Sequence, residues 1–106
     1  MNKKFQISGT WVDEIPLAEA TANANKALAL AVEKRQLFSK AVADDIDEGW
    51  QHVYCGWYTS ALNAARVAVR LEAKVLYFPR KEQEAHHYSE RMNAAGLPQY
   101  DHKHVP

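Results

Sequence analysis

Between Leu17 and Val42 the sequence contains neither glycine nor proline, and alanine recurs along the whole segment. The alanines of residues 18–24 alternate as they would in a strand, but alanine favours helices and is poorly suited to sheets. We therefore expect a helix over residues 14–43. It would begin near Asp13, whose side chain can accept hydrogen bonds from free N–H groups, with Pro16 in the first turn. Its apolar stripe would be Leu17, Ala24, Leu28, Ala31, Phe38 and Val42.

A second long helix is expected over residues 45–78, because apolar side chains recur there at steps of three or four. These residues are Ile46, Trp50, Val53, Trp57, Ala61, Ala64, Ala68, Leu71, Val75 and Phe78. Asp45 followed by Glu48 matches a capping box that would start the helix. The opposing observations are Gly56, which costs a helix about 1 kcal/mol relative to alanine, and the Trp, Tyr and Val content of 50–58. If that content prevails, the fold is α+β, with strands near 3–12, 50–58 and 74–78.

The remaining segments are shorter. A third helix is expected over residues 80–95, after Pro79, with Gly96 at its C-terminal end and Pro98 just beyond. Residues 97–106 are short and polar and are expected to form a flexible tail. Residues 3–12 alternate apolar and polar side chains around Gly9, which predicts a single strand or arm. Such a strand must pair elsewhere in the chain or with the same segment of a second copy.

The predicted fold class is therefore all-α: two long helices in an antiparallel hairpin, a shorter third helix and an N-terminal strand, in one domain of residues 1–106. Helices of about 28 and 33 residues would span about 40 and 50 Å. A third helix of about 16 residues cannot cover both of them. The uncovered apolar stripe is expected to meet a second copy across a two-fold axis, which predicts a helical homodimer.

Composition limits the classes of function. The chain has 13 Lys and Arg against 13 Asp and Glu, whereas a general nucleic-acid binder carries a basic excess. Its one cysteine, Cys55, excludes an internal disulfide framework and favours a reducing compartment. No apolar run is long enough for a signal peptide or a membrane span. We expect a cytoplasmic protein that has no membrane partner.

The strongest local feature is an aromatic cluster formed by Trp50, Tyr54, Trp57 and Tyr58. On a helix these four residues share one wide face. Tryptophan and tyrosine bury large areas and dominate protein interfaces, so the cluster is a candidate partner-binding surface. Two alternatives stay open. The cluster can form the core, including a dimer core, since large apolar residues are few among 17 alanines, or it can be a platform for a ligand.

A basic stripe runs along the second helix and past the proline: Arg66, Arg70, Lys74, Arg80 and Lys81. Guanidinium groups at this spacing can hold phosphate, and a nearby aromatic ring can stack on a base. The stripe therefore predicts nucleotide or nucleic-acid binding as the alternative function. The competing interpretation is a solvated face that borders alanine-rich packing.

Metal binding and catalysis find weaker support in the sequence. His52 and Cys55 would share a helix face, and with His86 and His87 they offer enough donors for zinc, but the spacing is not a known ligand pattern. Cys55 lies in an aromatic segment, where burial raises a thiol pKa rather than activating the thiol. There is no Gly-rich phosphate loop, nucleophile elbow or HExxH motif. We expect no metal, no cofactor and no enzymatic activity.

These observations predict a small interaction protein that acts as an adaptor or inhibitor. It would bind another macromolecule as a helical homodimer and present the remaining aromatic and basic surface. Small, neutral proteins without catalytic motifs often have this role, including those encoded by phages and other mobile elements.

Overall fold

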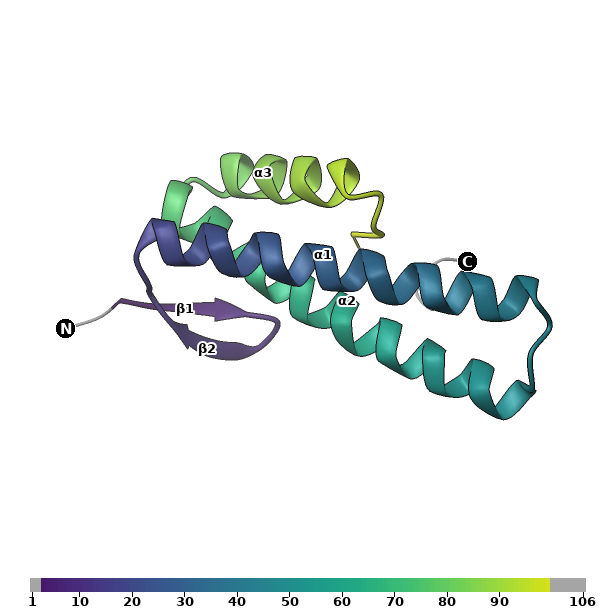
Figure 1. Ribbon diagram of the computed structural model, residues 1–106. Helices are drawn as coiled ribbons and strands as arrows, with labels where there is room; N and C mark the ends of the chain where they lie inside the picture. The colour runs from purple at the N-terminus through teal and green to yellow at the C-terminus, as the bar shows by residue number, and fades with distance from the viewer. Residues whose placement is uncertain (1–2, 100–106) are drawn as a thin grey trace.

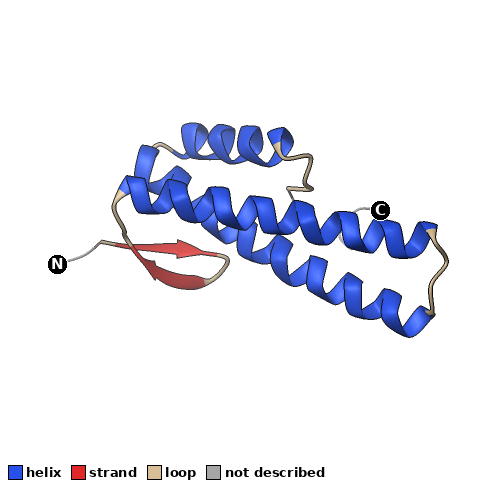
Figure 2. Cartoon of the chain, viewed as in Figure 1, coloured by secondary structure: helices blue, strands red, loops and turns tan. Residues whose placement is uncertain are grey.

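The computed structural model describes residues 3–99 as three helices and a two-stranded sheet (Figures 1 and 2). The elements are β1 (Lys4–Ile7), β2 (Thr10–Asp13), α1 (Leu17–Ala43), α2 (Glu48–Tyr77) and α3 (Lys81–Ala94). Helices α1 and α2 pack along each other as a hairpin, and α3 lies against α2. The all-α prediction is confirmed, and the alternative with strands near 50–58 and 74–78 is wrong because both segments belong to α2.

The N-terminal segment is a hairpin of two strands, not the single strand predicted for 3–12. Strands β1 and β2 pair antiparallel, with Phe5 opposite Val12 and Ile7 opposite Thr10. Ser8 and Gly9 form the turn with φ angles of 52° and 80°. Two consecutive residues with positive φ suit the tight turn of a β-hairpin. The strand thus finds its partner within the same chain, and pairing with a second copy is not needed.

Both long helices begin at residues other than those predicted. Asp13 is the last residue of β2, and α1 starts at Leu17, directly after Pro16. Helix α2 is capped by Asp47, whose carboxylate accepts a hydrogen bond from the backbone N–H of Gly49 at 3.1 Å. Asp45, the predicted cap, instead lies in the loop with a φ of 51°. The predicted elements are correct, and their first residues are shifted.

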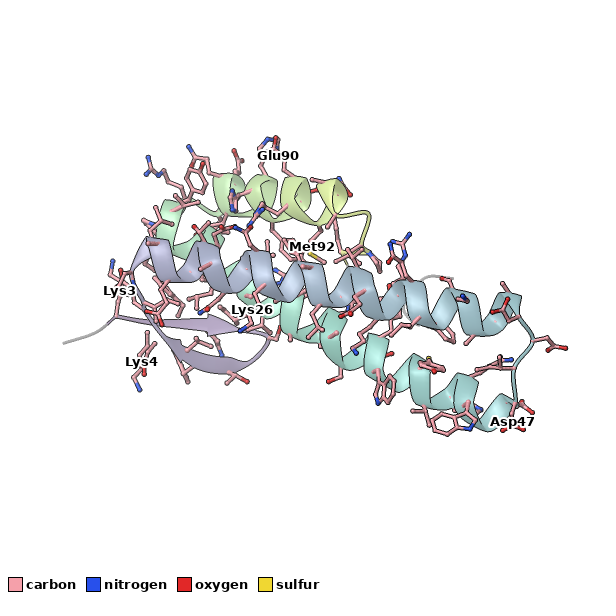
Figure 3. The ribbon with its side chains drawn as sticks, in the orientation of Figure 1. Lys3, Lys4, Lys26, Asp47, Glu90 and Met92 are labelled. Carbon is pink, nitrogen blue, oxygen red and sulfur yellow. The ribbon has the colours of Figure 1, made fainter. Side chains whose placement is uncertain are left out.

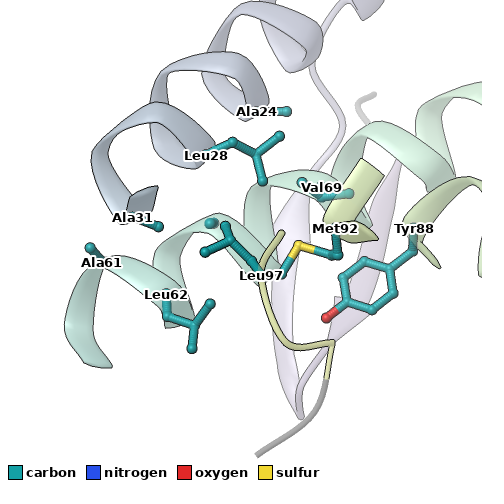
Figure 4. Close-up of a cluster of buried hydrophobic side chains, with 10 residues drawn as sticks. Ala24, Leu28, Ala31, Ala61, Leu62, Val69, Tyr88, Met92 and Leu97 are labelled. Atoms are coloured by element: carbon teal, nitrogen blue, oxygen red, sulfur yellow. The ribbon is translucent and has the colours of Figure 1, made fainter. Parts of the chain in front are cut away.

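The main core lies where α1, α2 and α3 meet, and alanine makes up much of it (Figure 4). Met92 and Val69 are its largest fully enclosed side chains. Around them pack Ala24, Leu28, Ala31, Ala61, Leu62, Ala65, Tyr88 and Leu97. Alanine removes little apolar area from water compared with leucine or methionine, so the stability gained per helix turn is small.

Helix α2 carries two apolar stripes rather than one. The stripe that faces the main core includes Leu62, Ala65 and Val69. The stripe predicted from the sequence lies beside it, and three of its large members are exposed: Trp50 at 56%, Val53 at 38% and Trp57 at 46%. The prediction identified a true apolar stripe, but the residues that pack against α1 and α3 are mostly others.

The β-hairpin covers the C-terminal part of this second stripe. Phe5 and Ile7 are buried against Leu71, and Val75 packs beside them. This small second core is separate from the main one. Toward the N-terminus of α2 the hairpin ends, and Trp50, Val53 and Trp57 of the second stripe are exposed.

A buried carboxylate joins α2 to α3. Glu72 is 3% exposed and accepts hydrogen bonds from Arg91 Nε at 2.9 Å and from the ring of His87 at 2.7 Å. Arg91 also donates to Asn25 on α1. Burial raises the pKa of Glu72, but the hydrogen bonds and charges of Arg91 and His87 outweigh it, so the pKa is lowered from 4.5. The ionised carboxylate therefore holds the helices together.

Helix α3 ends at the predicted glycine. Gly96 has a φ of 70°, and the backbone N–H groups of Gly96 and Leu97 donate to the carbonyls of Asn93 and Met92, which is a Schellman cap. Leu97 is buried in the main core. The flexible tail predicted from 97 onward therefore does not begin at this residue, and residues 100–106 lie outside the described part of the chain.

The molecule is elongated, with extents of 50 × 30 × 24 Å and a radius of gyration of 15.2 Å. A compact domain of this length has a radius of gyration of about 13 Å. The difference arises because α3 and the β-hairpin both pack at one end of the long helices (Figure 1). At the other end, which has the loop between α1 and α2, the described residues form a hairpin of two helices only (Figure 1).

Replacing Glu72 with glutamine tests the buried carboxylate. Glutamine keeps the size but removes the charge that pairs with Arg91, so the free energy of unfolding at pH 7 falls by about 2 kcal/mol. Because the folded pKa is lowered, this stabilisation is present above the unfolded value and is lost as the pH falls through the folded pKa. Urea titrations of E72Q and the wild type should therefore converge in acid. E82Q, at an exposed position of α3, should match the wild type, and an E72Q deficit that is independent of pH would contradict the assignment.

Candidate functional site

The uncovered part of the second stripe of α2 is the main apolar feature of the described surface. We define the open stripe as the exposed residues Trp50, Val53, Trp57 and Val67 of α2 and Leu30 of α1, together with the residues that line the hollows between them. These lining residues are Ala20 of α1 and Ala61, Ala64, Ala68 and Leu71 of α2, of which Ala20, Ala61 and Leu71 are buried. Leu30 is 44% exposed and Val67 is 36% exposed. Contiguous exposed apolar residues of this kind mark interaction surfaces more often than scattered ones do.

Two shallow hollows lie along the open stripe, between α1 and α2. One has a volume of about 330 Å³ and is lined by Leu30, Lys34, Trp57 and Ala64 among others. The next has a volume of about 470 Å³ and is lined mainly by Ala20, Ala64, Val67 and Leu71. Ala64 belongs to both hollows, so they form one groove. Small side chains make the groove, because alanine leaves the space that a leucine would fill.

The aromatic cluster predicted from the sequence is divided between two environments. The ring of Tyr54 contacts both tryptophans, with its centroid 6.4 Å from that of Trp50 and 5.1 Å from that of Trp57. Lys34 lies over the Trp57 ring at 5.3 Å. Tyr58 instead stacks on Phe38 of α1 and packs against the main core. The two tryptophans project into solvent, whereas Tyr58 contributes to folding.

The basic stripe is largely occupied by contacts within the chain. Arg66 donates to the carbonyl of Pro98 at 3.2 and 3.3 Å. Lys74 forms an ion pair with Glu84 at 2.8 Å. Arg70 lies over the ring of Tyr88, 4.1 Å from its centroid, a favourable cation–π arrangement. Arg66, Arg70 and Lys74 therefore attach α3 and the segment after it to α2.

The last two residues of the basic stripe, Arg80 and Lys81, are exposed at the start of α3. Lys81 lines a cavity of about 210 Å³ that also contains Arg70, Lys74 and Glu84. The structure thus brings Arg70, Lys74 and Lys81 together at one cavity. Arg66 and Arg80 do not line it.

The candidate metal ligands do not converge. His52 and Cys55 share a hollow with Glu48 near the start of α2, and no hydrogen bond joins His52 to Cys55. His86 and His87 lie on α3, where His87 binds Glu72 and His86 pairs with Glu90 at 3.6 Å. Within residues 3–99, no three of the His, Cys, Asp and Glu side chains are grouped so that they could hold a metal ion.

Two functional features escaped the sequence analysis. The groove depends on how α1 and α2 cross, which alanine spacing alone does not determine. The cavity beside Glu84 depends on the β-hairpin, α2 and α3 meeting, and no local pattern encodes that meeting. A partial signal existed in Glu84 and Lys81, which face the same side of a helix at a spacing of three.

None of the described helices is sufficiently long and apolar to cross a bilayer. Comparison of the chain with protein-family models, with curated proteins and with solved structures finds no match. The geometry of the described residues is therefore the basis for the function proposed below.

Substitutions on the two stripes of α2 should differ sharply in their effect on folding. Leu62→Ala leaves a cavity in the main core and lowers the free energy of unfolding by about 3 kcal/mol. Trp57→Ala removes a half-exposed ring and should change it by less than about 1 kcal/mol in dilute protein. Chemical denaturation followed by circular dichroism measures both. Unfolding of W57A would mean that the open stripe is part of the monomer core.

Proposed function

We propose that this chain is a non-enzymatic interaction protein that works as a homodimer, with the open stripe as its dimer interface. The observation that carries the proposal is the exposure of Trp50, Val53 and Trp57 beside a groove lined by alanines. Tryptophan is the residue most enriched among interface hot spots, and hot spots lie in pockets of the partner. The projecting rings and the groove lie on the same face of the chain. A second copy therefore presents its groove to the rings of the first.

A two-fold axis matches these two features to each other. The projecting rings lie toward the N-terminus of α2, and the larger hollow, lined by Ala64, Val67 and Leu71, lies toward its C-terminus. In an isologous interface each contact occurs twice, residue i with j and j with i. An axis near Ser60 and Ala61, midway between them, places the tryptophans of each copy over the hollow of the other. The two α2 helices then run antiparallel.

The area available is close to that of a standard protein interface. From Trp50 to Leu71 the open stripe is about 32 Å long at 1.5 Å per residue. Two neighbouring helices, with axes 8–10 Å apart, give the face a width of about 20 Å. The resulting area of roughly 600 Å² of flat projection approaches the about 800 Å² of accessible surface that each partner buries in a standard interface.

Charge supports the antiparallel arrangement. The loop between α1 and α2 contains Asp44, Asp45 and Asp47. At the opposite end of the molecule lie Lys3 and Lys4 (Figure 3), of which Lys4 also pairs with Asp13 at 3.6 Å. Figure 3 shows Asp47 at one end and the two lysines at the other. An antiparallel dimer brings the acidic loop of each copy toward the lysines of its partner. Complementary charges at the edge of an interface fix orientation and speed association.

Dimerisation explains how such a protein could act as an adaptor. A two-fold dimer carries two copies of every surface that the interface leaves free, including Trp11 on β2, which is 64% exposed. Two identical sites on one rigid body bind a paired or repeated target far more tightly than one site does. The same dimer would act as an inhibitor if it bound over the functional site of its target.

A single introduced cysteine tests the position of the axis. In a Cys55→Ser background, Ser60→Cys places two thiols near the axis, within the about 7 Å between Cα atoms that a disulfide tolerates. Mild oxidation should convert most of this variant to a covalent dimer on a non-reducing gel. The matched control Ser39→Cys, exposed on α1, should stay monomeric on the gel. Equal cross-linking of both variants would contradict the arrangement.

A charge on the open stripe should separate the two copies. Trp57→Glu places an unpaired carboxylate in the interface and should raise the dimer dissociation constant at least about 100-fold, which corresponds to about 2.7 kcal/mol. Light scattering during size-exclusion chromatography measures the mass directly. Trp11→Glu, an equally drastic change on β2, is the control and should leave the dimer intact. Loss of the dimer in both variants would show that the effect is not specific to the open stripe.

A further inference from the structure

The cavity between the β-hairpin, α2 and α3 has the composition of a small-ligand site. It is lined by Ile7 and Ser8 from β1 and its turn, by Arg70 and Lys74 from α2, and by Lys81, Glu84 and Tyr88 from α3. Residues from three elements thus converge on one partly open cavity. Ligand sites usually occur at such junctions, with an apolar lining and a few polar groups that fix orientation.

The carboxylate of Glu84, which lines the cavity, has one oxygen that lacks a hydrogen-bond donor. Its side chain is buried, with the residue only 9% exposed, and one carboxylate oxygen accepts from Lys74 at 2.8 Å. The other oxygen, Oε2, is buried and has no hydrogen-bond partner among residues 3–99. A buried carboxylate oxygen without a donor costs free energy, and such groups are rare in folded proteins. A ligand with an O–H or N–H group would supply that donor.

Whereas Glu84 offers a hydrogen-bond acceptor, Arg70 offers hydrogen-bond donors and a positive charge. Its guanidinium carbon lies 4.1 Å from the centroid of the Tyr88 ring, and a guanidinium packed on an aromatic ring can still donate hydrogen bonds from its edge. No described residue accepts a hydrogen bond from Arg70 or forms an ion pair with it. With Lys81 at the rim and the Lys74–Glu84 pair neutral as a unit, the cavity carries a net positive charge. A negatively charged group of a ligand would balance this positive charge.

We propose that this cavity binds a small carboxylic acid that carries a hydroxyl or ammonium group next to the carboxylate. The carboxylate would accept hydrogen bonds from Arg70 and Lys81, and the neighbouring donor would reach Glu84 Oε2. The volume of about 210 Å³ equals that of about seven water molecules, so the ligand has about seven non-hydrogen atoms. α-Hydroxy acids and small α-amino acids meet these requirements, whereas nucleotides are too large.

This site is independent of the proposed dimer. Its residues face the side of α2 that carries α3, and none of them belongs to the open stripe. The basic residues predicted to bind nucleic acid therefore keep an anion-binding role, for a much smaller anion. Arg66 takes no part, because it is bound to the carbonyl of Pro98.

The test is a titration of isotope-labelled full-length protein, in a buffer without carboxylate or phosphate, followed by amide chemical shifts. The probes are L-lactate, L-serine and propionate. Propionate has the carboxylate but no donor. Lactate, serine or both should produce saturable shifts centred on Ile7, Ser8, Ala73 and Ala85, and propionate should bind about tenfold more weakly, because Oε2 stays unpaired. The stronger of the two binders identifies whether the donor is a hydroxyl or an ammonium group.

Variants assign the roles. Arg70→Gln should weaken binding of the preferred probe at least tenfold, and Glu84→Gln should remove its advantage over propionate. Arg80→Gln has the same change of charge outside the cavity and should bind as the wild type does. Three results would overturn the proposal: no saturable shift with either donor-bearing probe, equal affinity for propionate, or an equal loss in R80Q. Unchanged circular dichroism of R70Q, E84Q and R80Q ensures that each comparison is made on folded protein.

Discussion

Helices α1 and α3 and the β-hairpin, through β1, all pack on α2, and that arrangement depends on the two apolar stripes of this one helix. One stripe takes α1 and α3 and forms the main core around Val69 and Met92. The second takes the β-hairpin at its C-terminal end, through Leu71, and is then left open toward Trp50. A helix that is apolar on two sides must be covered on both, and the described part of this chain is too short to do so. The proposed dimer follows from that shortage.

Polar contacts hold α3 in a fixed position on α2, which a core rich in alanine cannot do by itself. Helix α3 exposes most of its surface, so its position depends on the buried Glu72 with Arg91 and His87, and on the ion pair of Lys74 with Glu84. Such contacts are directional, and they fix the rotation of α3 on α2 more strictly than small apolar side chains can. The same rigid placement forms the cavity beside Glu84, where a carboxylate oxygen is left for a ligand to use. Stability and the proposed binding site thus have a common origin.

The sequence alone predicts the elements well and their surroundings less well. Helical spacing and the absence of glycine and proline determine both long helices, and Gly96 determines where α3 ends. The sequence does not determine which of two apolar stripes faces α1, because Trp57 and Leu62 are equally apolar and only packing selects between them. The pairing of β1 with β2 was missed because Ser8 at positive φ is an unusual choice for such a turn. The sequence shows the basic stripe, but its contacts with Pro98, Tyr88 and Glu84 depend on residues far along the chain.

The most direct test of the central claim is sedimentation velocity of the unmodified chain over a wide range of protein concentration. A dimer that dissociates only on dilution, and whose shape agrees with two molecules of 50 × 30 × 24 Å side by side, is the predicted result. It would show that two copies associate, as an uncovered apolar stripe on α2 requires. A particle of 12.0 kDa at all concentrations would contradict the account, because the tryptophans of α2 would then face water in the working protein.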